Sequence, residues 1–263
     1  MIKLIATDLD GTILNDDGGL NKEFESVFNE LEKRNIIFMA ASGRQYPNLK
    51  KVFECAKDRM MFVAENGTFA VHKGKELFCN SMKKENVEEI IEYTRTIKSK
   101  EAVLNTKYCA YIECKDPEFK EMLGTYCASI KVVDDLKDVK EEILKVAIHE
   151  EKAISENCQD YFDKFSDRLQ VCTSGDHWMD ISEKGVNKGT ALEHIKKEYN
   201  IDYNEVMIFG DQMNDFEMME TGYYSYAMEN AIDGLKERAR FMAGSNNNNG
   251  VLEKIKEVIG IQL

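Results

Sequence analysis

The chain has 263 residues, 43% of them hydrophobic and 32% charged, a composition typical of a soluble globular protein with one large domain or two smaller ones. Its net charge of −13 argues against nucleic acid or an anionic membrane as partner, because both need a basic surface. No apolar run approaches the roughly 18 residues of a membrane span. The first residues lack the pattern of a signal peptide, so we expect a cytoplasmic protein.

The cysteines and histidines do not indicate a metal centre. The seven cysteines form an odd set without a CxxC pair, which favours free thiols in a reducing compartment over disulfides or zinc. The four histidines are scattered, and none pairs with another at metal-ligand spacing. The histidines are therefore expected to be structural or surface residues.

The first predicted element is a buried strand that starts at Ile2 and ends in Asp8-Leu9-Asp10-Gly11-Thr12. Ligands of open α/β sheets bind beyond the carboxyl ends of the strands, where these two carboxylates lie. Strand alternation places Asp8 and Asp10 on one side and turns Leu9 away into packing. The spacing suits a nucleophile at Asp8 and a proton carrier at Asp10. Taken alone, however, Asp-Gly is most often a turn signal.

The next elements repeat a strand-loop-helix order. Apolar spacing predicts helices at 22–34 and 46–56 and strands at 36–41 and 60–64, followed by a hairpin over 69–78. This order is typical of a doubly wound parallel sheet, with the hairpin closing the first half.

The order then changes to that of an inserted α+β unit. The expected helices are 84–98, one beginning at 116, and 151–165, and the expected strands are 102–106, 109–114, 130–133, 143–149, 168–173 and 177–182.

The first pattern resumes after the insert with a helix over 188–199 and a strand over 206–209. We therefore expect a discontinuous core domain of residues 1–82 and 184–263 around an insert of residues 83–183. The run Asn246 to Asn249 is expected to be a loop that could also touch a substrate.

Three further motifs lie at predicted strand ends or helix starts. Ser42-Gly43 offers a hydroxyl donor and a residue without a side chain before a helix, which is typical of phosphate sites. Lys188 begins a helix and would supply the cation that a carboxylate needs to approach a phosphate dianion. The segment from Gly210 to Asp215 is a second acidic strand end, although Asp and Asn there could simply cap a helix.

Together these motifs resemble those of the haloacid dehalogenase (HAD) superfamily. DLDGT, Ser42-Gly43, Lys188 in GVNKG and the GDxxND pattern of GDQMND occur in the family's order, and Ser42-Gly43-Arg44 with Glu65-Asn66-Gly67 is similar to its Cof-type branch. The segment AMENA resembles that branch's AMGNA, with Glu229 at the usual glycine. The resemblance implies an α/β fold with a Rossmann-like doubly wound parallel sheet and an inserted α+β cap of the C2B type.

The resemblance also implies residue roles. Asp8 would form an aspartyl-phosphate, and Asp10 would protonate the leaving alcohol and then activate water. The residues expected to bind phosphate or substrate are Leu9, Ser42, Gly43, Arg44, Lys188 and Asn214. The ligands expected for Mg²⁺ are Asp8, the backbone carbonyl of Asp10, Asp211 and Asp215.

The implied function is Mg-dependent hydrolysis of a small phosphomonoester such as a sugar phosphate, and no oligomeric state is implied. One alternative is a phosphotransferase similar to phosphomannomutase, with Lys131, Lys145 and Lys152 holding a second phosphate. Another is a non-catalytic protein that binds a phosphorylated metabolite. Arg44 could instead form a structural ion pair. Residues 178–180 could line the substrate pocket or simply pack.

Overall fold

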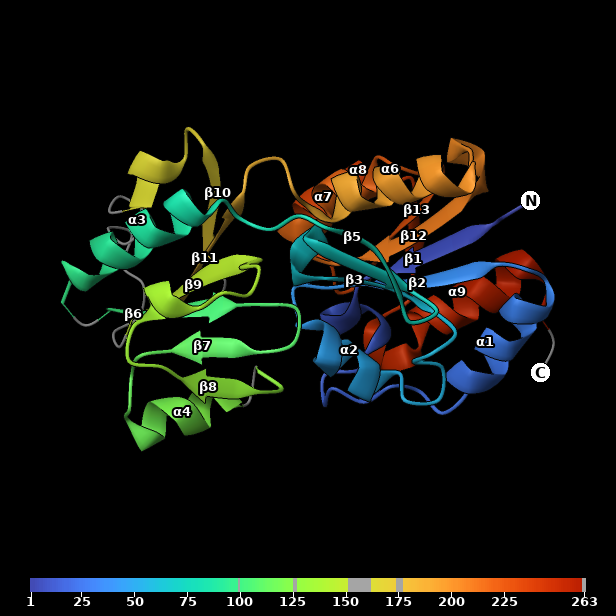
Figure 1. Ribbon diagram of the computed structural model, residues 1–263. Coiled ribbons are helices and arrows are strands. Elements are labelled where there is room, and N and C mark those ends of the chain that lie inside the picture. The colour runs from blue at the N-terminus through green and yellow to red at the C-terminus, as the bar shows by residue number, and fades with distance from the viewer. Residues whose placement is uncertain (99, 125–126, 151–161, 174–176, 262–263) are drawn as a thin grey trace. The chain divides into compact units, whose positions relative to one another are not determined.

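The chain divides into two compact units, which we call the first and second unit. The computed structural model describes residues 1–98, 100–124, 127–150, 162–173 and 177–261. The first unit comprises Met1–Arg44, Leu49–Phe78 and Asn187–Leu263, and the second comprises Gln45–Asn48 and Cys79–Val186 (Figure 1). None of the described helices combines the length and the apolar character needed to cross a bilayer.

The first unit contains an eight-stranded sheet in the order β14-β13-β12-β1-β2-β3-β4-β5. The pairs from β14 to β3 are parallel, and β4 is antiparallel to β3. The strands are β1 (Leu4–Thr7), β2 (Ile37–Ala41), β3 (Met61–Ala64), β4 (Phe69–His72), β5 (Lys75–Cys79), β12 (Val206–Gly210), β13 (Tyr224–Met228) and β14 (Phe241–Ala243). The central strands are apolar runs because both faces of the sheet are covered.

Helices lie on both faces of this sheet, with α6, α7 and α8 on one side and α1 and α9 on the other (Figure 1). The helices of this part of the chain are α1 (Phe24–Lys33), α2 (Tyr46–Val52), α6 (Lys188–Tyr199), α7 (Phe216–Met219), α8 (Asp233–Arg238) and α9 (Gly250–Ile259). The helix α2 ends four residues before the predicted end of 46–56. The expected doubly wound sheet is confirmed.

The second unit contains a six-stranded sheet in the order β10-β11-β9-β6-β7-β8. Its elements are α3 (Lys84–Arg95), β6 (Lys100–Asn105), β7 (Ala110–Ile112), α4 (Pro117–Gly124), β8 (Ile130–Val132), β9 (Lys145–Glu150), β10 (Leu169–Thr173) and β11 (Trp178–Glu183). Alternate residues of β6 join two separate apolar clusters, Leu104 packing with Ile90 of α3 and Val103 with Phe119 of α4. The insert is therefore the expected α+β unit.

Two helices of the insert differ from their predicted bounds in the described residues. The helix expected over 84–98 ends at Arg95, three residues early. Of the helix expected over 151–165, residues 151–161 lie outside the described residues, and Asp163–Phe165 forms a single helical turn.

The sheet of the first unit brings three sequence motifs to one edge. Strand β1 lies between β12 and β2, and Thr7 at its end pairs with Phe209 and Ala40. Because all three strands are parallel, the residues after their carboxyl ends meet beyond the same edge of the sheet. Asp8, Ser42 and Asp211 follow these strands.

Candidate active site

Three buried carboxylates form the centre of the candidate site. One carboxylate oxygen from each of Asp8, Asp211 and Asp215 lies within 4.8 Å of the others. Asp8 is 6% exposed, Asp211 4% and Asp215 not at all. Oxygen atoms so arranged are the ligands that a hard divalent cation prefers. In the part of the chain that the structure describes, this is the only such cluster.

The ammonium group of Lys188 lies among these carboxylates. Its Nζ is 2.5 Å from Asp8 Oδ1 and 2.7 Å from Asp215 Oδ1, and the side chain has no exposed surface. Helix α6 begins at this residue, and Asn187 caps it by accepting a hydrogen bond from the Thr190 N–H. Gly189 permits close packing, because a Cβ there would lie 2.6 Å from the backbone carbon of Glu217. The start of α6 is thus packed in place with its lysine pointing into the site.

The electrostatics of the cluster favour an additional positive charge. Burial raises the pKa of Asp8 to about 8, with Asp215 and Asp211 adding to the rise and Lys188 opposing it. Burial would lower the pKa of Lys188, but Asp215 and Asp8 outweigh it and raise that pKa. Three carboxylates face one ammonium group here, so the residues present suit a bound divalent cation.

The glycine and threonine of DLDGT hold Asp211. Thr12 donates a hydrogen bond from its hydroxyl to Asp211 Oδ1 at 2.7 Å. Gly11 has a φ of +72°, and a Cβ on it would lie 2.4 Å from Asp211 Oδ2. Only glycine fits both the conformation and the contact. The motif alone gives Thr12 no role, and its contact with Asp211 emerges only in the folded chain.

Asp10 lies apart from the buried cluster. Its carboxylate accepts hydrogen bonds from Arg44 Nε at 2.9 Å and from a terminal nitrogen of Arg44 at 2.5 Å. The Asp10 side chain is 56% exposed and that of Arg44 37%. The structural ion pair considered for Arg44 therefore forms here, and it connects the first motif to the second.

The predicted phosphate-binding residues surround the same strand ends. Ser42 is buried, and its hydroxyl oxygen accepts a hydrogen bond from the Arg44 N–H at 3.1 Å. Leu9 is fully buried, as expected for a side chain that turns into packing. Asn214 is exposed and donates from its side chain to Asn66 Oδ1 at 3.1 Å. Asn66 belongs to the Glu65-Asn66-Gly67 segment, which carried no assigned role.

Asparagines from two other segments support the DLDGT loop. Asn230 of AMENA donates from Nδ2 to the carbonyl of Gly11 at 2.7 Å, while neighbouring Glu229 is exposed. Asn246 is buried and donates from Nδ2 to the Leu14 carbonyl at 3.1 Å. The Asn246 segment therefore supports the loop that follows the first motif.

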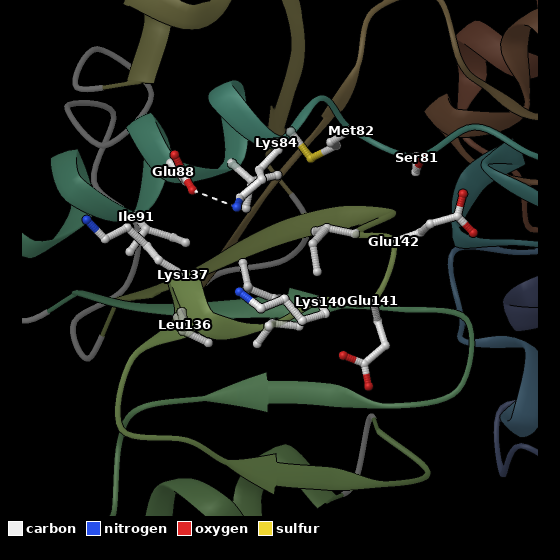
Figure 2. Close-up of a pocket in the computed structure, with 14 residues that line it drawn as sticks. Ser81, Met82, Lys84, Glu88, Ile91, Leu136, Lys137, Lys140, Glu141 and Glu142 are labelled. Atoms are coloured by element: carbon white, nitrogen blue, oxygen red, sulfur yellow. Dashed lines mark ion pairs between the residues drawn. The ribbon is translucent and has the colours of Figure 1, made fainter.

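The second unit contains a separate cavity of about 210 Å³ between α3 and the segment before β9. Figure 2 shows its charged rim, where Lys84 forms an ion pair with Glu88 at 3.4 Å. The lining mixes lysines and glutamates over an apolar floor and contains none of the clustered aspartates. The clustered aspartates all belong to the first unit. Of residues 178–180, Met179 is packed in the apolar core and Asp180 pairs with Lys145 at 3.1 Å.

Comparison with known proteins gives one consistent result. Residues 5–255 match the model of a family described as haloacid dehalogenase-like hydrolases. The chain is 32% identical to the Escherichia coli 5-amino-6-(5-phospho-D-ribitylamino)uracil phosphatase YbjI, over 98% of this chain and 96% of the relative. It is 23% identical to the Bacillus subtilis phosphatase YitU, named for the same substrate, over 98% of both chains. The crystal structure of SMU.1108c from Streptococcus mutans has a TM-score of 0.88 and 29% identity, covering 99% of this chain and 100% of that one.

Proposed function

Because the chain belongs to the haloacid dehalogenase-like hydrolase family and is a phosphoric monoester hydrolase, we propose that it acts through an aspartyl-phosphate on Asp8. One observation carries the proposal. Asp8 lies at the end of the central strand, buried, 2.5 Å from the Lys188 ammonium and beside two further carboxylates. A nucleophilic carboxylate needs such neutralisation to approach a phosphate group.

The cation that suits the cluster is Mg²⁺, held by Asp8 and Asp211 with Asp215 in support. When bound, it would polarise the phosphoryl group and offset the negative charge around it. We propose that the Asp10 backbone carbonyl completes the protein ligands.

The residues of this chain would divide the chemistry into two steps. In the first, a carboxylate oxygen of Asp8 forms a bond to phosphorus while the bond to the ester oxygen breaks, and Asp10 gives that oxygen a proton. In the second, Asp10 takes a proton from water as the water oxygen attacks phosphorus and frees Asp8. Lys188 neutralises charge in both steps. Inorganic phosphate and the alcohol are the products.

Phosphate binding is assigned to the loop after β2 and to the segment after β12. The Ser42 hydroxyl, the Gly43 backbone, Lys188 and Asn214 offer donors around the same strand ends, and Leu9 contributes its backbone. Arg44, which pairs with Asp10, is also assigned to the phosphoryl oxygens, because its guanidinium group suits planar contacts with phosphate.

The relatives indicate the first substrate to test. YbjI, YitU and a third relative from Bacillus subtilis, YcsE, are all named as phosphatases of 5-amino-6-(5-phospho-D-ribitylamino)uracil. This compound carries its phosphate on a sugar-alcohol chain, which agrees with the expected class of small phosphomonoesters. Substrate selection is assigned to residues 83–183 as a prediction.

The phosphotransferase alternative gains no support from the lysines considered for it. Lys131 donates to the Tyr111 hydroxyl at 2.9 Å, and Lys145 pairs with Asp180. Lys152 lies outside the described residues.

The proposal is tested by phosphate release from 5-amino-6-(5-phospho-D-ribitylamino)uracil, p-nitrophenyl phosphate and a panel of sugar phosphates. Each assay is run with Mg²⁺ and with EDTA, for the wild type and for Asp8→Asn, which keeps the side-chain shape and removes the nucleophile. We expect Mg-dependent release that falls at least about 1,000-fold in the variant. Trapping a phosphorylated enzyme and mapping the phosphate to Asp8 would identify the intermediate.

Release that is equal in EDTA, or that survives in Asp8→Asn, would contradict the mechanism. A folded wild type that releases phosphate from none of these esters would contradict the proposed activity.

A further inference from the structure

The turn Glu65–Gly67 has an unusual backbone. Its three residues have φ values of 49°, 55° and 104°, all in the left-handed region. For a residue other than glycine this conformation is strained, and it persists where the surroundings enforce it. Two such residues in succession indicate that the contacts of this turn hold it against strain.

Those contacts reach two of the proposed catalytic segments. The Asn66 N–H donates to the Ser42 carbonyl at 3.0 Å, and the Glu65 N–H donates to the Arg44 carbonyl at 3.1 Å. On the other side, a Cβ on Gly67 would lie 2.2 Å from the carbonyl oxygen of Asn187, directly before Lys188. The turn is therefore packed between the loop after β2, which contains Ser42 and Arg44, and the start of α6.

The Asn66 side chain reaches a third segment. Its Oδ1 accepts a hydrogen bond from Asn214 Nδ2 at 3.1 Å. Its carboxamide also lies against Gly43, since a Cβ there would be 3.1 Å from the Asn66 amide atoms. One side chain thus touches both the loop after β2 and the segment after β12.

We propose that Asn66 is a positioning residue that fixes the Asn214 carboxamide relative to the Ser42–Gly43 loop, so that both present donors to one phosphate group. By accepting one N–H of Asn214, Asn66 sets the orientation of the carboxamide and leaves its second N–H to donate to the ligand. Asn66 acts through its neighbours and does not itself react. This inference rests on the proposed phosphatase function.

The test variant is Asn66→Gly, because glycine keeps the positive φ without strain while the carboxamide is removed. The control is Asn200→Gly. Asn200 is also left-handed, with a φ of 52°, and ends α6 away from the site. We expect kcat/KM in Asn66→Gly to fall about 10- to 100-fold, as for a misplaced binding group, and Asn200→Gly to keep wild-type kinetics. Thermal unfolding of both variants checks that they are folded.

A double-mutant cycle separates positioning from a general structural effect. If Asn66 acts through Asn214, then Asn66→Gly combined with Asn214→Ala loses little more kcat/KM than Asn214→Ala alone. Inorganic phosphate should inhibit both single variants more weakly, with a higher inhibition constant than for the wild type. A distant structural change would not raise this constant.

The inference is overturned if Asn66→Gly is folded and within twofold of wild type in kcat/KM and in phosphate inhibition, or if the two losses multiply independently. These outcomes differ from failure of the proposed function, in which the wild type itself releases no phosphate from any ester.

Discussion

At the scale of single residues, Lys188 is a charged side chain in a fully buried position. Its side chain is fully buried, which disfavours a charge, yet two carboxylates lie within 2.7 Å and hold the ammonium form. Such an ion pair is costly to break on one side, because the partners left behind remain buried and charged. Lys188 therefore contributes to folding as well as to the proposed chemistry.

We predict that Lys188→Met lowers the free energy of unfolding by about 3 kcal/mol in metal-free protein, as for other buried pairs that lose one partner. Added Mg²⁺ should recover part of this loss, because it supplies positive charge to the same carboxylates. Urea unfolding with and without Mg²⁺ measures both effects, and phosphatase activity should be lost in either condition.

The matched control is Lys196→Met on the same helix. Lys196 donates to the Thr221 carbonyl at 2.6 Å and pairs with Glu193, whose side chain is 44% exposed. The only charge left behind is therefore one that water can solvate. Equal destabilisation by the two substitutions would argue against a special role for the Lys188 cluster.

At the scale of elements, the site depends on close packing between the turn at Gly67 and the start of α6. The backbone of Asn187 approaches Gly67 so closely that no side chain fits between them. The lysine that follows Asn187 reaches Asp8 from this start of α6. Gly67 has no functional side chain of its own, but its packing thus controls the position of Lys188.

We predict that Gly67→Ala destabilises the protein by more than 1 kcal/mol and also reduces kcat, because it combines backbone strain with a steric clash that displaces α6. The control is Gly74→Ala in the turn between β4 and β5. Gly74 has a φ of +74° but no atom within 4 Å of the added Cβ. The Gly74→Ala variant should lose about 1 kcal/mol of its free energy of unfolding from strain alone, and its kcat should stay at the wild-type value. Similar kcat values for the two variants would contradict the packing argument.

At the scale of the whole molecule, the net charge of −13 includes the carboxylates concentrated in the site. Burying them together opposes folding, and a cation that binds only the folded chain offsets that cost. Metal binding and stability should therefore be linked in this protein.

We predict that Mg²⁺ at 100 times its dissociation constant stabilises the first unit by about 2.7 kcal/mol relative to EDTA. Differential scanning calorimetry measures the shift. The Asp211→Asn variant should lose most of the stabilisation by Mg²⁺. The Asp17→Asn variant, which removes the same charge from an exposed position, should retain that stabilisation. An equal Mg²⁺ response in both variants would place the cation elsewhere.

The amino-acid sequence by itself determined the architecture and the identity of the chemical groups. Short apolar runs such as Leu4–Thr7 and Val206–Gly210, in alternation with amphipathic helices, favour buried parallel strands, and acidic residues directly after them are expected at the sheet edge. The doubly wound sheet and the inserted α+β unit were predictable for this reason, and the family was predictable from the resemblance of the four motifs to those of the HAD superfamily. The roles assigned to the site residues stay predictions that the experiments above test.

Only the tertiary structure decided which groups meet. The motif resemblance predicts a lysine near Asp8, but nothing in the local sequence indicates that Arg44 pairs with Asp10, that Lys188 also contacts Asp215, or that Asn66 holds Asn214. These partners are 27 to 180 positions apart, and their contacts depend on the order of the strands and the packing of α6. Local pattern encodes which residues are buried and where elements end. Side-chain pairing over long sequence separations follows from the packed fold.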